Sequence, residues 1–364
     1  MSTHVQDSDV RSGPDRYVSE IGAAARLGDY LQDYRKPVIV TGRKSFAAFA
    51  DYAAGNAGSA GVAGDLPVLR YDGSATIRNA HEVADWVAEL SADAIVAIGA
   101  GKLADTAKNV AEFTGADLIM VPTMAATCAA YSALSVNYDD KHRYVSAPLH
   151  PRNSNLVLVD AALVGKAPRE FLIGGIGDTL AKWYESVPVF ARAGELGAFD
   201  RLAQQSARLI RDVLLAEGEA ALASYDSGNV DGHLRLVVDA IIGLGGTVGG
   251  FGGVRARASG AHAMHDALTL LPGSTRVVHG SKVAYGIIVQ LIAEGKEDEA
   301  RSLLPFYRAV GLPYSFATMG LEPNEGDWRT VAEFAAGPKS AFGLAVPGIT
   351  ADAIIAAMRE AERL

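Results

Sequence analysis

Three histidines and one aspartate are the residues whose types and spacing best suit chemistry in this chain of 364 residues. His262 and His265 are three residues apart, so a helix would place them on one face. His279 follows a loop that contains Pro272, and Asp178 stands among glycines in the first turn of a predicted helix. One carboxylate and two imidazoles suit Zn²⁺, and they would also accept Fe²⁺ or Mn²⁺. We predict that Asp178, His262 and His279 bind one divalent metal.

A metal at these three residues would act on a carbonyl or alcohol oxygen. Three protein ligands leave a position open for the substrate, where a Lewis acid polarises the carbonyl and stabilises the alkoxide that forms when hydride arrives. His265 would then support the ligands or relay a proton, although it could equally be an imidazole that packs between helices. The three histidines could also be ordinary core residues, but finding three of the chain's eight histidines so close together weakens that alternative.

A glycine-containing turn lies between a predicted strand (94–98) and a predicted helix (103–113). Its residues are Gly99, Ala100, Gly101 and Lys102. Such a turn lets the backbone approach a pyrophosphate, and the helix N-terminus offers unpaired N–H groups and the positive end of its dipole. We predict that this turn and Asp105, in the first helical turn, bind a nicotinamide dinucleotide. The pattern lacks a third glycine, so it would also suit a simple tight turn.

Two further segments follow predicted strands and could contact the same cofactor. The first contains Gly42, Arg43, Lys44 and Ser45. Its cations and hydroxyl stand where an acid would exclude a 2′-phosphate, which favours NADP(H) over NAD(H), although a solvated basic turn would look the same. The second segment, 121–135, leaves the carboxyl end of a strand, where Thr123, Thr127 and Ser132 could serve the nicotinamide and its ribose. Alternatively, these hydroxyls satisfy only their own backbone.

Short apolar strands alternate with helical patterns over the first half of the chain, which predicts a parallel sheet with right-handed crossovers. We expect strands at 38–41, 68–71, 94–98, 118–122 and 156–160, helices at 17–34, 45–53, 80–90 and 103–113, and a hairpin at 134–139 and 143–146. Beyond residue 165 only helical patterns remain. The expected fold class is therefore α/β plus all-α. It comprises a disordered tail (1–16), a Rossmann-like nucleotide-binding domain (17–165) and a helical metal-binding domain (166–364).

The whole-chain composition is that of a soluble globular protein, with 49% apolar and 21% charged residues. The net charge of −9 argues against a nucleic-acid or membrane partner. Cys128 is the single cysteine, so no intrachain disulfide is possible. The N-terminal residues lack the apolar core of a signal peptide, and the apolar run 236–248 is too short to span a membrane. We expect a cytoplasmic enzyme with a small-molecule substrate.

Taken together, these motifs resemble the iron-containing alcohol dehydrogenase superfamily, and its glycerol dehydrogenase branch in particular. The resemblance covers residues 17–364 and includes the pairs Gly177-Asp178 and His279-Gly280. It implies the dehydroquinate synthase-like fold, homo-oligomeric assembly, and a metal-dependent, NAD(P)-linked oxidoreductase that interconverts carbonyls and alcohols. It gives metal-ligand roles to Asp178, His262 and His279. It also implies nicotinamide-side contacts near Thr123, Ser132, Leu134 and Tyr138.

Two departures from the family pattern concern the metal and the substrate. Iron-binding relatives have a fourth ligand, a histidine, four residues after the acid, where this chain has Lys182. This favours three protein ligands and hence zinc. Glycerol dehydrogenases have an aspartate beside the diol, where this chain has Cys128. Its loss removes a charge that would repel a substrate carboxylate, and Lys182 could add a compensating cation unless it forms an ion pair with Glu185 or Asp178.

The segments 127–130 and 177–185 look closest to the hydroxycarboxylate dehydrogenases of this group. Our main hypothesis is therefore reduction of a small 2-oxo acid to a 2-hydroxy acid by NADPH, with Zn²⁺ on the carbonyl oxygen. The alternatives are an NAD-linked glycerol or 1,2-diol dehydrogenase, a dehydroquinate synthase-like cyclase, and a non-catalytic binding protein. The cyclase is disfavoured because it needs a glutamate ligand and a basic phosphate pocket.

Overall fold

The computed structural model of the chain describes residues 9–55, 65–141 and 143–364. The chain divides into two compact units. The α/β unit comprises Arg11–Pro168 and Ser224–Gly250, and the helical unit comprises Arg169–Ala223 and Phe251–Leu364 with Asp9 and Val10. The division near Pro168 lies close to the boundary expected at residue 165. Residues 224–250 were expected in the helical domain, but they pack with the α/β unit.

A parallel sheet of six strands forms the centre of the α/β unit, with the order β1-β8-β5-β4-β2-β3. The strands are β1 (Arg16–Ser19), β2 (Pro37–Thr41), β3 (Val68–Arg70), β4 (Ala94–Gly99), β5 (Asp117–Pro122) and β8 (Leu156–Val159). All six residues of β4 are buried, as expected for a central parallel strand covered on both faces. The expected parallel sheet is thereby confirmed.

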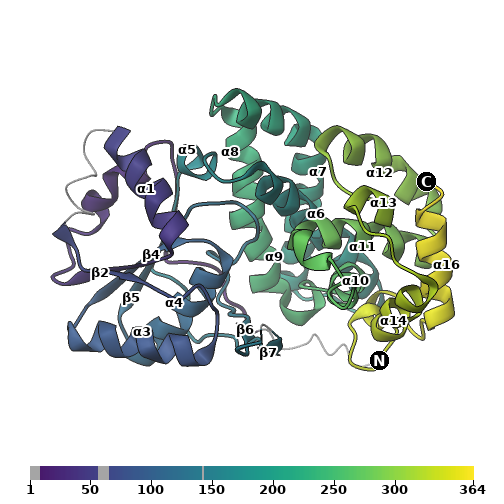
Figure 1. Cartoon of the computed structure of the whole chain (residues 1–364), viewed down its shortest axis with the longest axis horizontal. Coiled ribbons are helices and arrows are strands. Elements are labelled where there is room, and N and C mark those ends of the chain that lie inside the picture. The colour runs from purple at the N-terminus through teal and green to yellow at the C-terminus, as the bar shows by residue number, and fades with distance from the viewer. Residues whose placement is uncertain (1–8, 56–64, 142) are drawn as a thin grey trace. The chain divides into compact units, whose positions relative to one another are not determined.

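Helices cover both faces of this sheet (Figure 1). The helices of the unit are η1 (Ala24–Tyr30), α1 (Arg43–Gly55), α3 (Ile77–Glu89), α4 (Gly101–Thr114), α5 (Ala161–Val164), α8 (Gly232–Asp239), η2 (Ala240–Leu244) and α9 (Gly245–Gly252, which continues into the helical unit). Alternate β4 residues, Ala94, Val96 and Ile98, share one core with Phe49 of α1, while α3 and α4 lie on the other face. The expected hairpin is present as the antiparallel pair β6 (Asn137–Tyr138) and β7 (Tyr144–Ser146).

The N-terminal part of the unit differs from expectation in two places. The helix expected at 17–34 is wrong at its start, because Tyr17 and Val18 pair with β8 as strand β1, and only Ala24–Tyr30 is helical. Residues 1–8 of the expected tail lie outside the described residues. In the described part of this segment, Arg11 N donates to Gly250 O at 3.0 Å, and Asp15 N donates to Ser154 O at 3.1 Å.

The segment Gly232–Arg255 meets the length and composition of a membrane-spanning helix, but 61% of its most apolar stretch is buried inside the fold. Asp239 in this segment accepts hydrogen bonds from Tyr17 Oη at 2.7 Å and Ser19 Oγ at 2.9 Å. Thr247 donates to Tyr131 Oη at 3.2 Å. These bonds to β1 and the 121–135 loop explain why residues 224–250 belong to the α/β unit. Together with the burial of the segment, they are typical of a helix in the core of a fold.

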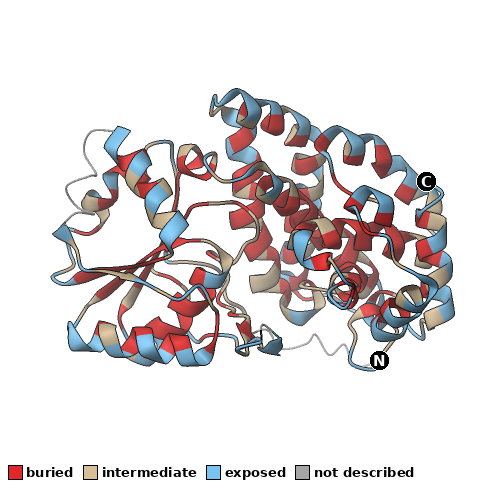
Figure 2. Cartoon of the chain, viewed as in Figure 1, coloured by how far each residue is buried: buried red, intermediate tan, exposed pale blue. Residues whose placement is uncertain are grey.

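The helical unit is built around α6, α10 and α11, and Figure 2 shows α6 and α11 largely buried. Its helices are α6 (Arg169–Arg192), α7 (Ala198–Ser227, which continues into the α/β unit), η3 (Gly253–Arg255), α10 (Gly260–Leu268), η4 (Ser274–Arg276), α11 (His279–Ala293), α12 (Glu297–Val310), α13 (Phe316–Met319), α14 (Glu325–Ala335), α15 (Phe342–Ala345) and α16 (Ala351–Ala361). Glycines permit the close packing of the three central helices. A Cβ on Gly280 would lie 1.8 Å from Gly174 O, and one on Gly286 would lie 2.3 Å from Ala261 O.

Candidate active site

Three helices of the helical unit bring the predicted metal ligands together. Asp178 lies on α6, His262 on α10, and His279 is the first residue of α11. His262 Nε2 lies 3.2 Å and His279 Nε2 lies 3.1 Å from Asp178 Oδ1. One ligand atom from each residue lies within 4.8 Å of the other two. Asp178 is in the middle of α6 and not in a first turn as expected, because α6 runs straight through the glycines that pack against α11.

This donor set fits a small divalent cation. In a tetrahedral site with ligand bonds near 2.1 Å, neighbouring donor atoms are about 3.4 Å apart, which is close to the two distances from the aspartate. Asp178 is almost fully buried, whereas the His279 side chain is 42% exposed. The site is therefore closed on the aspartate side and accessible beside His279, as a site with an open coordination position requires.

The electrostatics of the cluster depend on two buried carboxylates. Burial acts to raise the pKa of Asp178, but hydrogen bonds from His262 and His279 outweigh it and hold the pKa well below its ordinary value. Burial acts to lower the pKa of His262, but Glu185 and Asp178 raise it to about 9. The cluster thus keeps Asp178 ionised and stabilises a positive charge beside it. A bound cation would also supply such a charge.

Glu185 is a part of this cluster that the sequence reasoning missed as a contributor to the metal site. Its Oε2 lies 2.7 Å from His262 Nδ1, on the side of the ring away from Asp178. Burial acts to raise the pKa of Glu185, but His262 and Lys182 lower it. A signal was available: Glu185 follows Asp178 by seven residues, two helical turns, and so lies on the same face of α6.

His265 and Lys182 also adjoin the cluster. His265 Nε2 lies 2.9 Å from His279 Nδ1, and His265 Nδ1 lies 2.9 Å from Asp266 Oδ1. Burial and the neighbouring His279 lower the pKa of His265 to about 3. Lys182 is buried, one turn beyond Asp178, and its ammonium donates to Arg257 O at 2.9 Å. The structure therefore places both residues where the sequence predicted, beside the candidate ligands.

The predicted pyrophosphate turn lies in the α/β unit. β4 ends at Gly99 and α4 begins at Gly101. The N-cap residue is Ala100, so no side chain at that position caps the N–H groups of the first turn. Lys102 is exposed in the first turn. A Cβ on Gly101 would lie 3.7 Å from Thr127 Oγ1. The strand-to-helix turn and the 121–135 loop are thus neighbours, as a shared cofactor site requires.

Asp105, which the sequence predicts to contact the cofactor, takes part in an ion pair. It is buried and pairs with Lys108, whose Nζ lies 3.0 Å from Asp105 Oδ1. Lys108 Nζ also donates to the backbone oxygens of Ala129 and Ser132. Burial raises the pKa of Asp105 despite this partner. The ion pair and the bonds from Lys108 connect the 121–135 loop to α4.

The proposed 2′-phosphate segment keeps its two cations exposed but engages its hydroxyl. Arg43 and Lys44 lie in the first turn of α1 and are exposed. Ser45 Oγ accepts from Gly42 N at 3.1 Å and lies 3.3 Å from Thr41 Oγ1. The assignment of Ser45 to the phosphate is therefore weakened, whereas the two cations remain available.

The predicted nicotinamide-side residues are spread along the 121–135 loop and the hairpin. Thr123 is buried and its N donates to Gly99 O at 3.0 Å, next to the turn. Thr127 Oγ1 accepts from Ala129 N at 3.3 Å. Half-buried positions are held by Cys128, Ser132, Leu134 and Tyr138. Thr123 and Thr127 lie next to the pyrophosphate turn. Leu134 forms an isolated antiparallel β-bridge with Leu149, and Tyr138 N donates to Ala75 O.

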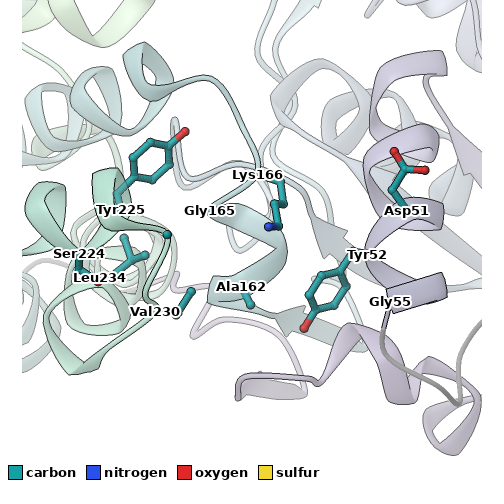
Figure 3. A pocket seen from close by; sticks show the side chains of 11 residues that line it. Asp51, Tyr52, Gly55, Ala162, Gly165, Lys166, Ser224, Tyr225, Val230 and Leu234 are labelled. Atoms are coloured by element: carbon teal, nitrogen blue, oxygen red, sulfur yellow. The ribbon is translucent and has the colours of Figure 1, made fainter.

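A separate pocket of about 260 Å³ opens between α1, α5, α8 and the end of α7. Figure 3 shows Lys166 between Tyr52 and Tyr225 in this pocket. Tyr225 Oη donates to Ala167 O. None of the site residues predicted from the sequence lines it, so this pocket is not the expected cofactor site.

Comparison with known proteins decides the family. The family model described as iron-containing alcohol dehydrogenase matches residues 14–161. Hydroxycarboxylate dehydrogenase A of Escherichia coli (strain K12) is 35% identical over 316 residues, which cover 86% of this chain and 85% of that protein. The chain belongs to the iron-containing alcohol dehydrogenase family. Glycerol dehydrogenase of Pseudomonas putida is 34% identical over 356 residues, which cover 96% of each chain.

The solved structures agree with this membership. The chain superposes on a probable glycerol dehydrogenase from Sinorhizobium meliloti 1021 with a TM-score of 0.83 and 29% identity, covering 98% of each chain. The expected two-part fold, α/β followed by helical, is therefore confirmed. The protein is an oxidoreductase of the alcohol and hydroxycarboxylate dehydrogenase type. Membership of the iron-containing alcohol dehydrogenase family implies a nicotinamide dinucleotide and a metal ion as cofactors.

Proposed function

We propose that this dehydrogenase reduces a small 2-oxo acid to the 2-hydroxy acid, with NADPH as hydride donor and Zn²⁺ held by Asp178, His262 and His279. The observation that carries the proposal is the convergence of these three residues within 4.8 Å. A divalent cation bound there would act as a Lewis acid on the substrate carbonyl. Asp178 supplies the ligand charge, and the two imidazoles supply neutral ligand atoms.

A chain of hydrogen bonds connects His279 to an exposed acid. His279, His265 and Asp266 form a hydrogen-bonded chain with both distances at 2.9 Å, and the Asp266 side chain is 63% exposed. We propose that His265 orients His279 through this chain, because the Nδ1–H of a metal-bound His279 would donate to His265 Nε2. The alternative role of His265, packing between helices, involves no such link to an exposed acid.

Lys182 supports zinc over iron in this proposal. It occupies the position at which iron-binding relatives place a fourth ligand, and its buried ammonium is directed to Arg257 O. An ammonium has no lone pair for a metal, so three protein ligands remain. Its positive charge, one helical turn from Asp178, would also partly offset the negative charge of a substrate carboxylate in the site.

The choice of a 2-oxo acid depends on Cys128 and on the relatives. A thiol adds no negative charge beside the substrate, unlike the aspartate of glycerol dehydrogenases. The similarity to hydroxycarboxylate dehydrogenase A supports a hydroxy acid and its oxo acid as substrates, whereas the comparable similarity to the Pseudomonas putida glycerol dehydrogenase supports glycerol. The diol dehydrogenase is therefore our second candidate. The cyclase is the weakest, since the acidic ligand here is Asp178 and not a glutamate.

We also propose that the enzyme works in the cytoplasm as a homo-oligomer, without a nucleic-acid or membrane partner.

The preference for NADPH rests on Arg43 and Lys44. Both are exposed at the start of α1, directly after β2, and neither forms an ion pair with another described residue. Two uncommitted cations there suit a 2′-phosphate.

A substrate panel tests the proposed reaction. Purified enzyme would be assayed with small 2-oxo acids and with glycerol and 1,2-diols, each with NADPH and NADH or their oxidised forms, alongside elemental analysis. We expect turnover of an oxo acid with NADPH and about one zinc per chain. Faster turnover of diols with NAD would establish the second candidate instead. Release of phosphate from a sugar phosphate would favour the cyclase.

The role of Cys128 is tested by Cys128→Asp. We expect kcat/KM for oxo acids to fall roughly tenfold relative to diols, because like-charge repulsion of ~1.4 kcal/mol corresponds to that ratio. Cys128→Ser is the matched control, since it keeps the size of the side chain and adds no charge, so its ratio should stay near that of the wild type. An unchanged ratio in Cys128→Asp would remove this residue from substrate selection.

A further inference from the structure

Glu185 is a buried carboxylate whose two oxygen atoms have different partners. Oε1 accepts from two backbone groups, Ser259 N at 2.7 Å and His262 N at 2.8 Å. Oε2 lies 2.7 Å from the ring atom His262 Nδ1. The side chain is 1% exposed. Two of these three contacts come from backbone N–H donors, and the third atom, His262 Nδ1, is a donor when it carries a proton. An ionised carboxylate only accepts hydrogen bonds, so it suits this site.

This arrangement determines which ring nitrogen of His262 carries the proton. A carboxylate at Nδ1 requires a proton on Nδ1, and a neutral ring then leaves the lone pair on Nε2. Nε2 is the atom that lies 3.2 Å from Asp178 Oδ1, within the candidate metal cluster. We propose that Glu185 is a positioning residue for the metal, because it fixes His262 in the tautomer and orientation that direct a lone pair at the cation. This inference rests on the proposed metal site.

A second residue, Gln290 of α11, also hydrogen-bonds to the start of α10. Comparing the two residues separates control of the His262 tautomer from the simple attachment of this helix. Gln290 Oε1 accepts from Ala261 N at 3.0 Å, and its Nε2 donates to Tyr184 O at 2.9 Å. Gln290 therefore connects the first turn of α10 to α6 and α11 through hydrogen bonds that do not involve the imidazole of His262. Glu185 ties the same turn and also holds the ring. A purely structural role would make the two residues comparable.

The variant Glu185→Gln changes the tautomer and keeps the tether. The amide oxygen can still accept from Ser259 N and His262 N, and the amide group then presents its NH₂ to Nδ1. Nδ1 must become the acceptor, so the proton moves to Nε2, where it occupies the lone pair needed by the metal. In the flipped orientation of the amide, its NH₂ would face the two backbone N–H groups, and both hydrogen bonds would be lost. This orientation is therefore disfavoured.

Metal binding and folding would be measured separately on purified full-length protein. Zn²⁺ affinity would be obtained by competition with a chromophoric chelator, and Co²⁺ would report ligand geometry through its visible spectrum. For Glu185→Gln we expect a 10- to 100-fold loss of Zn²⁺ affinity and weakened Co²⁺ bands, while the metal-free chain unfolds near the wild-type temperature. For the control Gln290→Met we expect a lower unfolding temperature and a Zn²⁺ affinity close to that of the wild type.

The outcomes distinguish this inference from the proposed function. A wild-type chain that binds neither Zn²⁺ nor Co²⁺ would overturn the metal site itself. Wild-type binding with equal affinity in Glu185→Gln would overturn only the role of Glu185. If that variant does not fold, ¹⁵N-histidine spectra of the zinc-loaded wild type decide: a proton on Nδ1 of His262 supports the inference, and a proton on Nε2 contradicts it.

Discussion

Replacing His279 with alanine is expected to remove the metal and nearly all turnover while the chain remains folded. The His279 side chain is 42% exposed and stands at the first position of α11, so its loss creates little empty space. It provides one of the three ligand atoms of the cluster. Two ligands, Asp178 and His262, should not retain zinc. We expect kcat/KM to fall by roughly 10³-fold or more, which corresponds to the several kcal/mol that a Lewis acid contributes.

The measurements for this prediction are elemental analysis, steady-state kinetics and thermal unfolding of the same preparation. His81→Ala is the matched control, because His81 is an exposed histidine that stacks on Phe113 in the α/β unit. That variant should keep both its zinc and its turnover. Full activity of His279→Ala, or of wild-type enzyme stripped of metal by a chelator, would refute the metal-dependent mechanism.

The sheet could be predicted from the sequence because its central strands are continuous apolar runs. β4 has the sequence Ala-Ile-Val-Ala-Ile-Gly and is buried throughout. β1 could not be predicted, because Arg16–Ser19 is short and becomes a strand only by pairing with β8, about 140 residues later. The placement of residues 224–250 likewise depends on distant partners, such as the bond between Asp239 and Tyr17.

The candidate site shows the same division between residue type and spatial context. Asp178, His262 and His279 could be proposed from their chemistry, and the structure brings them together. The partner of Asp105 was not foreseen: Lys108 lies three residues later on the same face of the helix and pairs with it. The part played by Glu185 depends on where α10 lies against α6, and no local pattern specifies that contact.

Replacing Gly280 with alanine is expected to damage both the fold and the metal site, because α6 and α11 touch at this residue. An added Cβ would lie 1.8 Å from Gly174 O, and the obstacle is backbone that cannot rotate away. Overpacking of this kind costs about 3 kcal/mol at the upper end of the usual range. The two helices must separate, and His279, the preceding residue, would move away from Asp178.

We therefore expect Gly280→Ala to unfold at a clearly lower temperature and to bind zinc more weakly, as followed by circular dichroism and elemental analysis. Gly343→Ala is the control, since a Cβ at that helical, exposed glycine would meet no atom within 4 Å. It should leave both properties unchanged. Wild-type stability and zinc content in Gly280→Ala would mean that the two helices do not pack this closely. The ligands on α6 and α11 would then be held together by something other than the contact between Gly174 and Gly280.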